Sequence, residues 1–200
     1  MKRDDTRNDH PRPSSGRKPA PDARFTGEEN EFAHRPIEQC YWVVPGRLLA
    51  GEYPRNVDEG SSRDKIDALL RAGVTTFVDL TEEGELRPYT GLIGAAAWHR
   101  RFPVRDAAVP ESPAVAAAAL DAIDRGIEGG GRVYVHCWGG VGRTGVIVGC
   151  WLARHGFPGE AALARLRELW RQCPKSRRRP SPDMWEQERY VLRWTEGGRP

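Results

Sequence analysis

The residues best suited to chemistry lie together in residues 136–145, which read HCWGGVGRTG. An apolar segment with strand character ends in His136 and Cys137, and a glycine-rich loop leads from there to Arg143, Thr144 and an apolar helical segment. Glycines allow successive backbone N–H groups to face one point, and the positive end of a helix lies beside them. The stretch therefore predicts a cradle for an anion such as a phosphoryl group.

Cys137 opens this loop, so its sulfur is expected to point into the cradle. The field that binds an anion also favours thiolate over thiol, and such placements lower the pKa of a cysteine from about 8.5 to roughly 3.5–7.5. Arg143 stands where the loop becomes helix, and a guanidinium binds two phosphate oxygens at once. A nucleophile and a phosphate clamp are therefore expected in one loop. The backbone N–H groups expected to hold phosphate belong to Trp138, Gly139, Gly140, Val141, Gly142 and Arg143.

Other interpretations of this loop fit less well. A nucleotide-binding P-loop requires GxxxxGK[ST], and alignment on Gly142 puts Cys137 at its first glycine and Arg143 at its lysine. A rhodanese-type loop closes one residue earlier. A structural strand–helix turn with an inert buried cysteine is the plain alternative, but it does not explain why Cys, Gly, Arg and Thr all occur at the spacing that phosphate chemistry needs.

The stretch resembles the Cys-x5-Arg-[Ser/Thr] signature of the cysteine-dependent protein tyrosine and dual-specificity phosphatase superfamily. The resemblance covers roughly residues 40–194. Through residues 84–86, 102–106 and 136–140 it is nearest to the branch that contains the cyclin-dependent-kinase-associated phosphatase. It implies a single α/β domain with a central, mostly parallel sheet flanked by helices, and chemistry that needs neither a cofactor nor a metal.

The resemblance assigns the general acid to Asp106, which follows a predicted strand in a loop of small residues. The residues themselves only permit this role, since a solvated loop aspartate is the plain alternative. Asp79 is a weaker rival because it lies inside a predicted strand. Glu111 is better explained as a charge near a helix N-terminus.

Thr144 is predicted as a further catalytic residue, and His136, Gln187 and Glu85 are predicted as supporting residues, the last two from the resemblance. The hydroxyl of Thr144 would donate to the sulfur, and His136 would orient the loop, a role close to that of an ordinary core histidine. Gln187 would lie near the hydrolytic water, and Glu85 would brace Arg143. The plain alternatives are an exposed helix face for Gln187 and a loop carboxylate for Glu85.

The expected activity is metal-independent hydrolysis of phosphomonoesters on phosphoproteins, on tyrosine and/or serine and threonine, through a phospho-cysteine intermediate. Trp138 and Val141 stand where phosphoinositide phosphatases of the superfamily often carry lysines, which disfavours a highly charged lipid headgroup. Two alternatives stay open: a phosphoprotein-binding pseudophosphatase, and a phosphatase of a non-protein substrate such as an RNA 5′-triphosphate or an inositol phosphate. The scattered histidines show no metal-ligand spacing.

The elements that must position these residues alternate between strand and helix, which predicts an α/β domain with a largely parallel sheet. Pro45 and Gly46 form a turn between two short strands. Ser112 is expected as an N-cap before Pro113, and Ser181-Pro182 is expected to open the last helix. The strands are predicted at 41–44, 47–50, 74–80, 98–104 and 132–136, and the helices at 66–70, 92–96, 112–129, 144–155, 158–171 and 181–194.

Composition sets the outer limits. Of 200 residues, 38% are hydrophobic and 30% charged, which suits a globular chain. We expect a disordered polar leader at residues 1–35, a phosphatase domain at 36–196 and a flexible tail at 197–200. The longest apolar stretch, within 145–153, is far shorter than the roughly 20 residues of a membrane span.

Charge and cysteines limit the partners and the compartment. The formal net charge of +3 permits an anionic substrate and does not demand nucleic acid. No secretory signal is visible, so the four cysteines are interpreted as reduced thiols of a cytoplasmic, monomeric protein. The basic run Arg177–Arg179 is either a solvated face or a guide for an acidic phosphopeptide or RNA.

Overall fold

A five-stranded sheet with the order β1-β2-β5-β3-β4 organises the computed structural model, which describes residues 34–195. Strands β1 and β2 form an antiparallel hairpin, and every other pairing is parallel. The predicted mostly parallel α/β sheet is therefore confirmed. The strands are β1 (Cys40–Val44), β2 (Leu48–Gly51), β3 (Val74–Asp79), β4 (Trp98–Arg101) and β5 (Arg132–His136).

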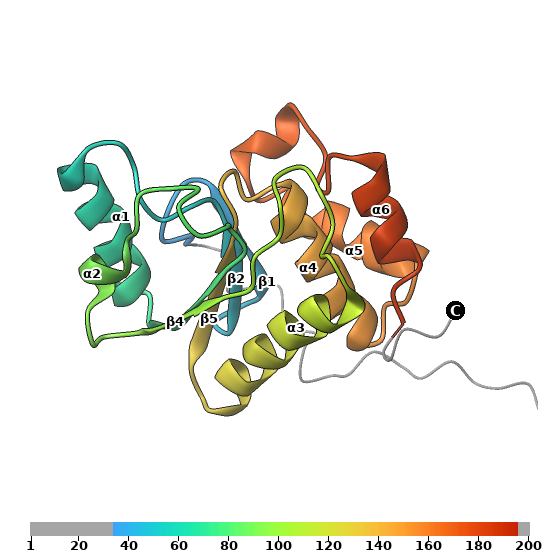
Figure 1. The fold of residues 1–200 in the computed structure, drawn as a ribbon, viewed down its shortest axis with the longest axis horizontal. Coiled ribbons are helices and arrows are strands. Elements are labelled where there is room, and N and C mark those ends of the chain that lie inside the picture. The colour runs from blue at the N-terminus through green and yellow to red at the C-terminus, as the bar shows by residue number, and fades with distance from the viewer. Residues whose placement is uncertain (1–33, 196–200) are drawn as a thin grey trace, which may run out of the picture.

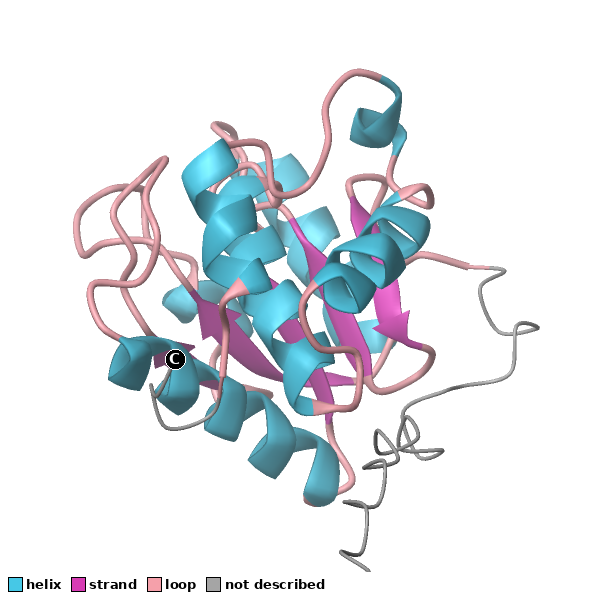
Figure 2. Ribbon diagram, turned by 90° about the vertical axis from the view of Figure 1, so that its right-hand side faces the viewer, coloured by secondary structure: helices cyan, strands magenta, loops and turns pink. Residues whose placement is uncertain are grey.

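Helices cover both faces of the sheet (Figures 1 and 2). One face packs against α1 (Glu59–Arg71) and α2 (Thr90–Ile93), and the other packs against α3, α4, α5 and α6. Within β5, Val133 and Val135 belong to the core on the second face, while Tyr134 belongs to the core on the first. Both faces are buried, which explains why the strands read as apolar runs. The remaining helices are α3 (Pro113–Glu128), α4 (Gly142–Arg154), α5 (Glu160–Trp170), the 3-10 turn Pro174–Arg177 and α6 (Trp185–Leu192).

The register brings polar strand ends to one edge of the sheet. Asp79 of β3 is paired with His136 of β5 and with Arg101 of β4, and His136 is paired with Gly51 of β2. Because parallel strands all end at the same edge, the loop that follows His136 begins directly above this row. The fold thus fixes the place of the glycine-rich loop before any side chain of the site is considered.

Several predicted boundaries need correction. The last helix begins at Trp185 and not at Ser181, because the buried Ser181 hydroxyl donates to the carbonyl of Val141 at 2.8 Å and ties its segment to the loop after β5. Ser112 occupies the predicted N-cap position, but its side chain forms no capping hydrogen bond. The strand predicted to reach residue 104 ends at Arg101, and the helix predicted for 92–96 spans Thr90–Ile93.

The proposed leader and tail fall mostly outside the described residues, which exclude 1–33 and 196–200. Among residues 34–195, no helix combines the length and the apolar character needed to cross a membrane.

Candidate active site

The loop between β5 and α4 is held from outside by its carbonyl groups. The carbonyl of Trp138 accepts from the N–H of Tyr53 at 2.8 Å, that of Gly139 from Lys175 Nζ at 2.9 Å, and that of Val141 from the Ser181 hydroxyl at 2.8 Å. In a trans peptide the N–H points opposite to the carbonyl. The N–H groups that follow these three carbonyls therefore turn toward the inside of the loop, as an anion cradle requires.

One position of the loop, residue 140, can hold only glycine. Gly140 has φ of +72°, and a Cβ atom there would lie 2.3 Å from the backbone carbon of Gly51. The loop consequently packs directly against the end of β2, which no larger residue would allow.

The sulfur-bearing residue and the guanidinium share one cavity. Cys137 and Arg143 both line a hollow of about 260 Å³ above the loop, and both are almost fully buried. Asp106 and Gln187 line the same hollow. The structure therefore brings together residues predicted from separate stretches of the chain.

Arg143 is positioned by a two-pronged ion pair. Its Nη1 and Nη2 atoms lie 2.8 and 2.7 Å from the two carboxylate oxygens of Glu85, and Nη1 also donates to the carbonyl of Val104 at 3.0 Å. Burial disfavours the charged guanidinium, but the hydrogen bonds to Glu85 and the nearby Cys137 outweigh it and raise the pKa of Arg143. Burial would also raise the pKa of Glu85, and the hydrogen bond from Arg143 reverses this, so the Glu85 pKa lies below its usual value.

Asp106 lies on the rim of the cavity. Its Oδ1 atom is 2.9 Å from Arg143 Nη2, and its side chain is 62% exposed. The next residue, Ala107, has φ of +56°, a left-handed conformation that is rare for a residue with a side chain. Asp106 and Ala107 both line the cavity.

Gln187 joins the Asp106 loop to the loop after β5. It is fully buried, and its Nε2 atom donates to the carbonyl of Ala108 at 2.9 Å. A Cβ atom on Gly142 would approach its Oε1 to 2.7 Å, and that oxygen has no hydrogen-bond partner among the described residues. The alternative of an exposed helix face is therefore wrong for Gln187.

His136 contacts the loop from below. Its Nδ1 lies 3.3 Å from the carbonyl oxygen of Cys137, and its Nε2 lies 2.7 Å from the hydroxyl of Tyr89. Burial lowers the pKa of His136 to about 4 and raises the pKa of Tyr89 well above its ordinary value. At neutral pH a neutral His136 therefore accepts from Tyr89 and donates from Nδ1 to the Cys137 carbonyl.

Thr144 departs from expectation. Its hydroxyl is buried and has no hydrogen-bond partner among the described residues, so the predicted donation to the sulfur of Cys137 is not formed in this structure. Thr144 lies in the first turn of α4, where its backbone is fixed by the helix.

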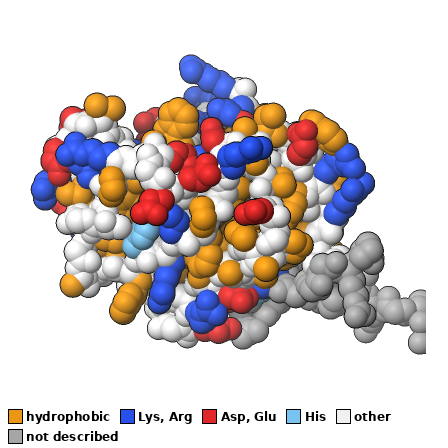
Figure 3. Space-filling model, in the orientation of Figure 1, with side chains coloured by type: hydrophobic (Ala, Val, Ile, Leu, Met, Phe, Trp, Pro, Cys, Tyr) orange, Lys and Arg blue, Asp and Glu red, His pale blue; other side chains and the backbone are white. Residues whose placement is uncertain are grey.

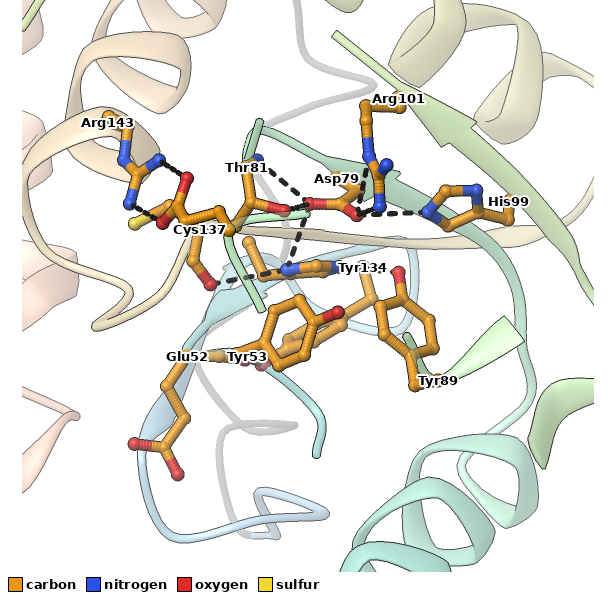
Figure 4. Close-up of polar contacts among 12 residues, drawn as sticks. Glu52, Tyr53, Asp79, Thr81, Tyr89, His99, Arg101, Tyr134, Cys137 and Arg143 are labelled. Carbon is orange, nitrogen blue, oxygen red and sulfur yellow. Dashed lines mark hydrogen bonds and ion pairs between the residues drawn. The ribbon is translucent and has the colours of Figure 1, made fainter. Parts of the chain in front are cut away.

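Asp79 is excluded as the acid by its surroundings. It is completely buried and accepts from the N–H and hydroxyl of Thr81 at 2.9 and 2.7 Å, while His99 Nε2 and Arg101 Nη2 each lie 3.0 Å away (Figure 4). Burial would raise the pKa of Asp79, but these donors and the nearby His136 hold it well below its usual range. Asp79 does not line the cavity of Cys137, and its carboxylate oxygens are occupied by these donors, so it cannot protonate a leaving group there.

Some residues around the site carry no sequence signal. Nothing in the pattern marks Lys175 or Ser181 as partners of the loop, since both contacts join segments about 40 residues apart. His99 and Arg101 are two residues apart on β4 and so share a face, a signal that could have suggested their common partner Asp79. No group of three or more possible metal ligands occurs within residues 34–195.

Comparison with known proteins agrees with this geometry. The family model PTP-SAK, described as "Swiss Army Knife protein, DSP-PTPase phosphatase domain", matches residues 37–187. The chain is similar to the putative tyrosine phosphatase 067L of Invertebrate iridescent virus 3, with 31% identity over 120 residues, which covers 58% of this chain and 47% of that protein. The chain spans less than half the length of the curated relatives it matches.

Solved structures share the fold. A mutant form of Tk-PTP superposes with a TM-score of 0.61 at 21% identity, over 76% of this chain and 91% of that one. Kinase associated phosphatase, with its catalytic-site cysteine replaced by serine, superposes with a TM-score of 0.59 at 17% identity, over 72% of this chain and 83% of that one. At these identities the likeness establishes the architecture alone, and it is the architecture expected from the sequence.

Proposed function

We propose, given that the chain belongs to the PTP-SAK family of DSP-PTPase phosphatase domains, that it hydrolyses phosphomonoesters of phosphoproteins through a phospho-cysteine intermediate. The observation that carries the proposal is the shared cavity of Cys137 and Arg143, in which a nucleophile and a phosphate-binding cation face the same volume. The substrate residues are phosphotyrosine and/or phosphoserine and phosphothreonine.

In the first step, the Cys137 thiolate attacks phosphorus. A sulfur–phosphorus bond forms, the bond from phosphorus to the leaving oxygen breaks, and Asp106 gives its proton to that oxygen. Arg143 and the inward N–H groups of the loop hold the other phosphoryl oxygens as charge moves onto them. Asp106 lies on the rim of the same cavity, 2.9 Å from Arg143 Nη2, so its protonated carboxyl group can reach a leaving oxygen there.

In the second step, water attacks phosphorus and displaces the sulfur. Asp106 now accepts a proton from the water, the sulfur–phosphorus bond breaks, and inorganic phosphate leaves. The buried Gln187 Oε1, which lacks a partner among the described residues, is suited to orient this water. The substrate, one water molecule, Cys137 and Asp106 together account for every bond and proton in the two steps.

A phosphate-release assay tests the proposal. The 200-residue chain in chelator is given an aryl phosphate, phosphotyrosine and phosphothreonine peptides, an inositol phosphate and an RNA 5′-triphosphate. We expect release from the aryl phosphate and the peptides, and loss of release in Cys137→Ser with peptide binding retained. Cys150→Ser, a change at a buried cysteine of α4 outside the cavity, should keep the activity.

The panel also separates the alternatives. Peptide binding without release by the wild type would mean a binding module and not an enzyme. Release confined to the inositol phosphate or the RNA would reject a protein substrate, and full activity in Cys137→Ser would reject the mechanism.

A further inference from the structure

A second hollow opens on the other side of Trp138. It has a volume of about 670 Å³ and lies between the segment that follows β2 and the segment that precedes α2. Trp138 lines both this hollow and the cavity of Cys137. We call it the flanking groove; its lining includes Tyr53, Arg55, Val57, Leu86, Arg87 and Trp138.

The groove presents apolar surface that the fold itself does not use. Val57 is 97% exposed and Trp138 is 61% exposed, and both border the groove. Exposed apolar side chains that gather beside a cavity often mark a binding surface, whereas scattered ones do not. Tyr53 is held in place because its hydroxyl donates to the carbonyl of Arg87 at 3.1 Å. The wall formed by Tyr53 is therefore preformed.

The charges of the groove are largely neutralised. Arg55 and Arg87 both pair with Glu59, Arg87 at 3.5 Å, and Asp58 caps α1 by accepting from the N–H of Ser61 at 2.8 Å. Asp58 and Glu59 together offset the charges of Arg55 and Arg87, so this region has no net charge that would attract a phosphate or an acidic side chain. The groove is consequently suited to an apolar occupant.

We propose that the flanking groove binds the polypeptide segment beside the phosphorylated residue and takes up a large aromatic or aliphatic side chain. The proposal rests on the proposed function. A phosphoryl group above Cys137 leaves the rest of its substrate near the mouth of that cavity, where Trp138 forms the wall shared with the groove. Burial of one large apolar side chain there is expected to raise kcat/KM about tenfold.

The test uses pairs of phosphopeptides that differ at one position, Phe in one and Ser in the other, with the position moved along both sides of the phosphorylated residue. The wild-type 200-residue chain and its Val57→Asp variant are compared. Val57 is so exposed that the substitution should leave the melting temperature unchanged. Trp98→Asp is the matched control, because Trp98 is 70% exposed and lines neither hollow.

We expect the wild type and Trp98→Asp to prefer the Phe peptide about tenfold in kcat/KM at one or more positions. Val57→Asp should lose that preference and keep its rate on a small aryl phosphate. A wild type that cleaves phosphopeptides without regard to the flanking residue would overturn the groove and leave the proposed function standing. A wild type that cleaves no phosphopeptide would overturn the proposed function and the groove with it.

Two further outcomes point to a different occupant. A faster peptide reaction in Val57→Asp would mean that another segment of this chain fills the groove. An equal loss on peptide and aryl phosphate would mean that the substitution damages the catalytic cavity. Either result would overturn the proposal.

Discussion

The proposed mechanism requires that Asp106 and substrate phosphate compete for the same edge of Arg143. In the free site the Asp106 carboxylate lies 2.9 Å from Nη2, whereas Glu85 and the Val104 carbonyl hold the rest of the guanidinium. Asp106 is the more exposed of the two carboxylates, so it is the one that an incoming phosphate displaces. In the proposed mechanism, displacement moves the Asp106 carboxyl group away from the guanidinium that favours its ionised form, so that it can carry a proton to the leaving oxygen.

We therefore predict that Asp106→Asn lowers kcat by about 10²–10⁴-fold while vanadate and phosphate inhibit at least as well as in the wild type. The loss reflects the missing proton donor, and binding is spared because a neutral amide competes less for Arg143 than a carboxylate does. Steady-state kinetics on a phosphopeptide and inhibition constants check both parts. Asp183→Asn, at another carboxylate of the cavity that is paired with Arg179, should affect kcat much less. Weakened inhibition with normal kcat would assign the proton transfer elsewhere.

Glu85 is predicted to act on Arg143 and not on substrate. Glu85→Gln removes the charge of the pair but keeps the size of the side chain, so we expect a loss of about 1–3 kcal/mol in the free energy of unfolding. The kcat/KM should fall as well, because the guanidinium loses its orienting partner. The exposed Glu83→Gln is the matched control, and a Glu85→Gln protein as stable and active as that control would contradict the role.

The pH dependence of this effect follows from the lowered pKa of Glu85. A carboxyl whose pKa is lower in the folded state than in the unfolded state contributes stability above its unfolded pKa of about 4.3, and the contribution is lost as pH falls through the folded pKa. The difference in the free energy of unfolding between wild type and Glu85→Gln should therefore become smaller as the pH is lowered. Urea unfolding at neutral and at acidic pH measures it.

At the scale of elements, the ends of β3, β4 and β5 form the base of the site. The register sets Asp79 beside both His136 and Arg101, and His136 in turn bonds to the carbonyl of Cys137. The position of Cys137 is thus coupled to a buried polar cluster that cannot be rearranged without loss of hydrogen bonds.

The buried His136 is expected to make the stability of the fold depend on pH in mild acid. Its pKa is lowered to about 4 in the folded state, against about 6.5 when unfolded, because burial disfavours the imidazolium. As pH falls below 6.5, this histidine is protonated in the unfolded chain but not in the folded protein. The free energy of unfolding therefore has its full value above pH 6.5 and falls by on the order of 3 kcal/mol as pH approaches 4. Urea unfolding from pH 7 to pH 5 should show this slope, and His136→Gln should flatten it. If the free energy of unfolding of His136→Gln depended on pH as steeply as that of the wild type, another group would be responsible for the titration.

Local sequence patterns were sufficient to predict which strands and helices follow one another along the chain, but not where each of them begins and ends. The hairpin, the buried β3 and β5 and the loop after β5 follow from periodicity, glycines and turn residues near each other in the chain. Ser181 looked like a helix N-cap because only its neighbours could be considered. In the structure, its hydroxyl donates instead to Val141, 40 residues earlier. Residues whose role depends on such distant contacts were found only where a resemblance supplied them, as for Glu85 and Gln187.

At the scale of the whole molecule, the face seen in Figure 3 carries charges of both signs. Figure 3 shows basic and acidic side chains interspersed over the face that it presents. Of the basic run Arg177–Arg179, only Arg179 lines the catalytic cavity, where it pairs with Asp183. Interspersed charge gives weak long-range steering. Recognition is therefore expected to depend on contacts at the cavity and the flanking groove.

The extent of the domain is the last prediction. Every strand and helix of residues 34–195 lies between Cys40 and Leu192, and the buried apolar residues extend from Ile37 to Trp194. We propose that residues 36–196 suffice for folding and catalysis. Of the described contacts, such a chain loses those of Arg35, which donates to the carbonyls of Glu38 and Cys40, and the weak 3.4 Å bond from Trp42 to the His34 carbonyl.

Loss of such surface contacts changes stability by about 0.5 kcal/mol. The 36–196 chain should therefore melt within a few degrees of the 200-residue chain and keep its kcat/KM on an aryl phosphate, measured by calorimetry and phosphate release. A chain that begins at residue 45 lacks β1 and with it the buried Tyr41, Trp42 and Val43, so it should fail to fold cooperatively. A 36–196 chain that behaves like this shorter one would mean that the folded domain extends upstream of residue 36.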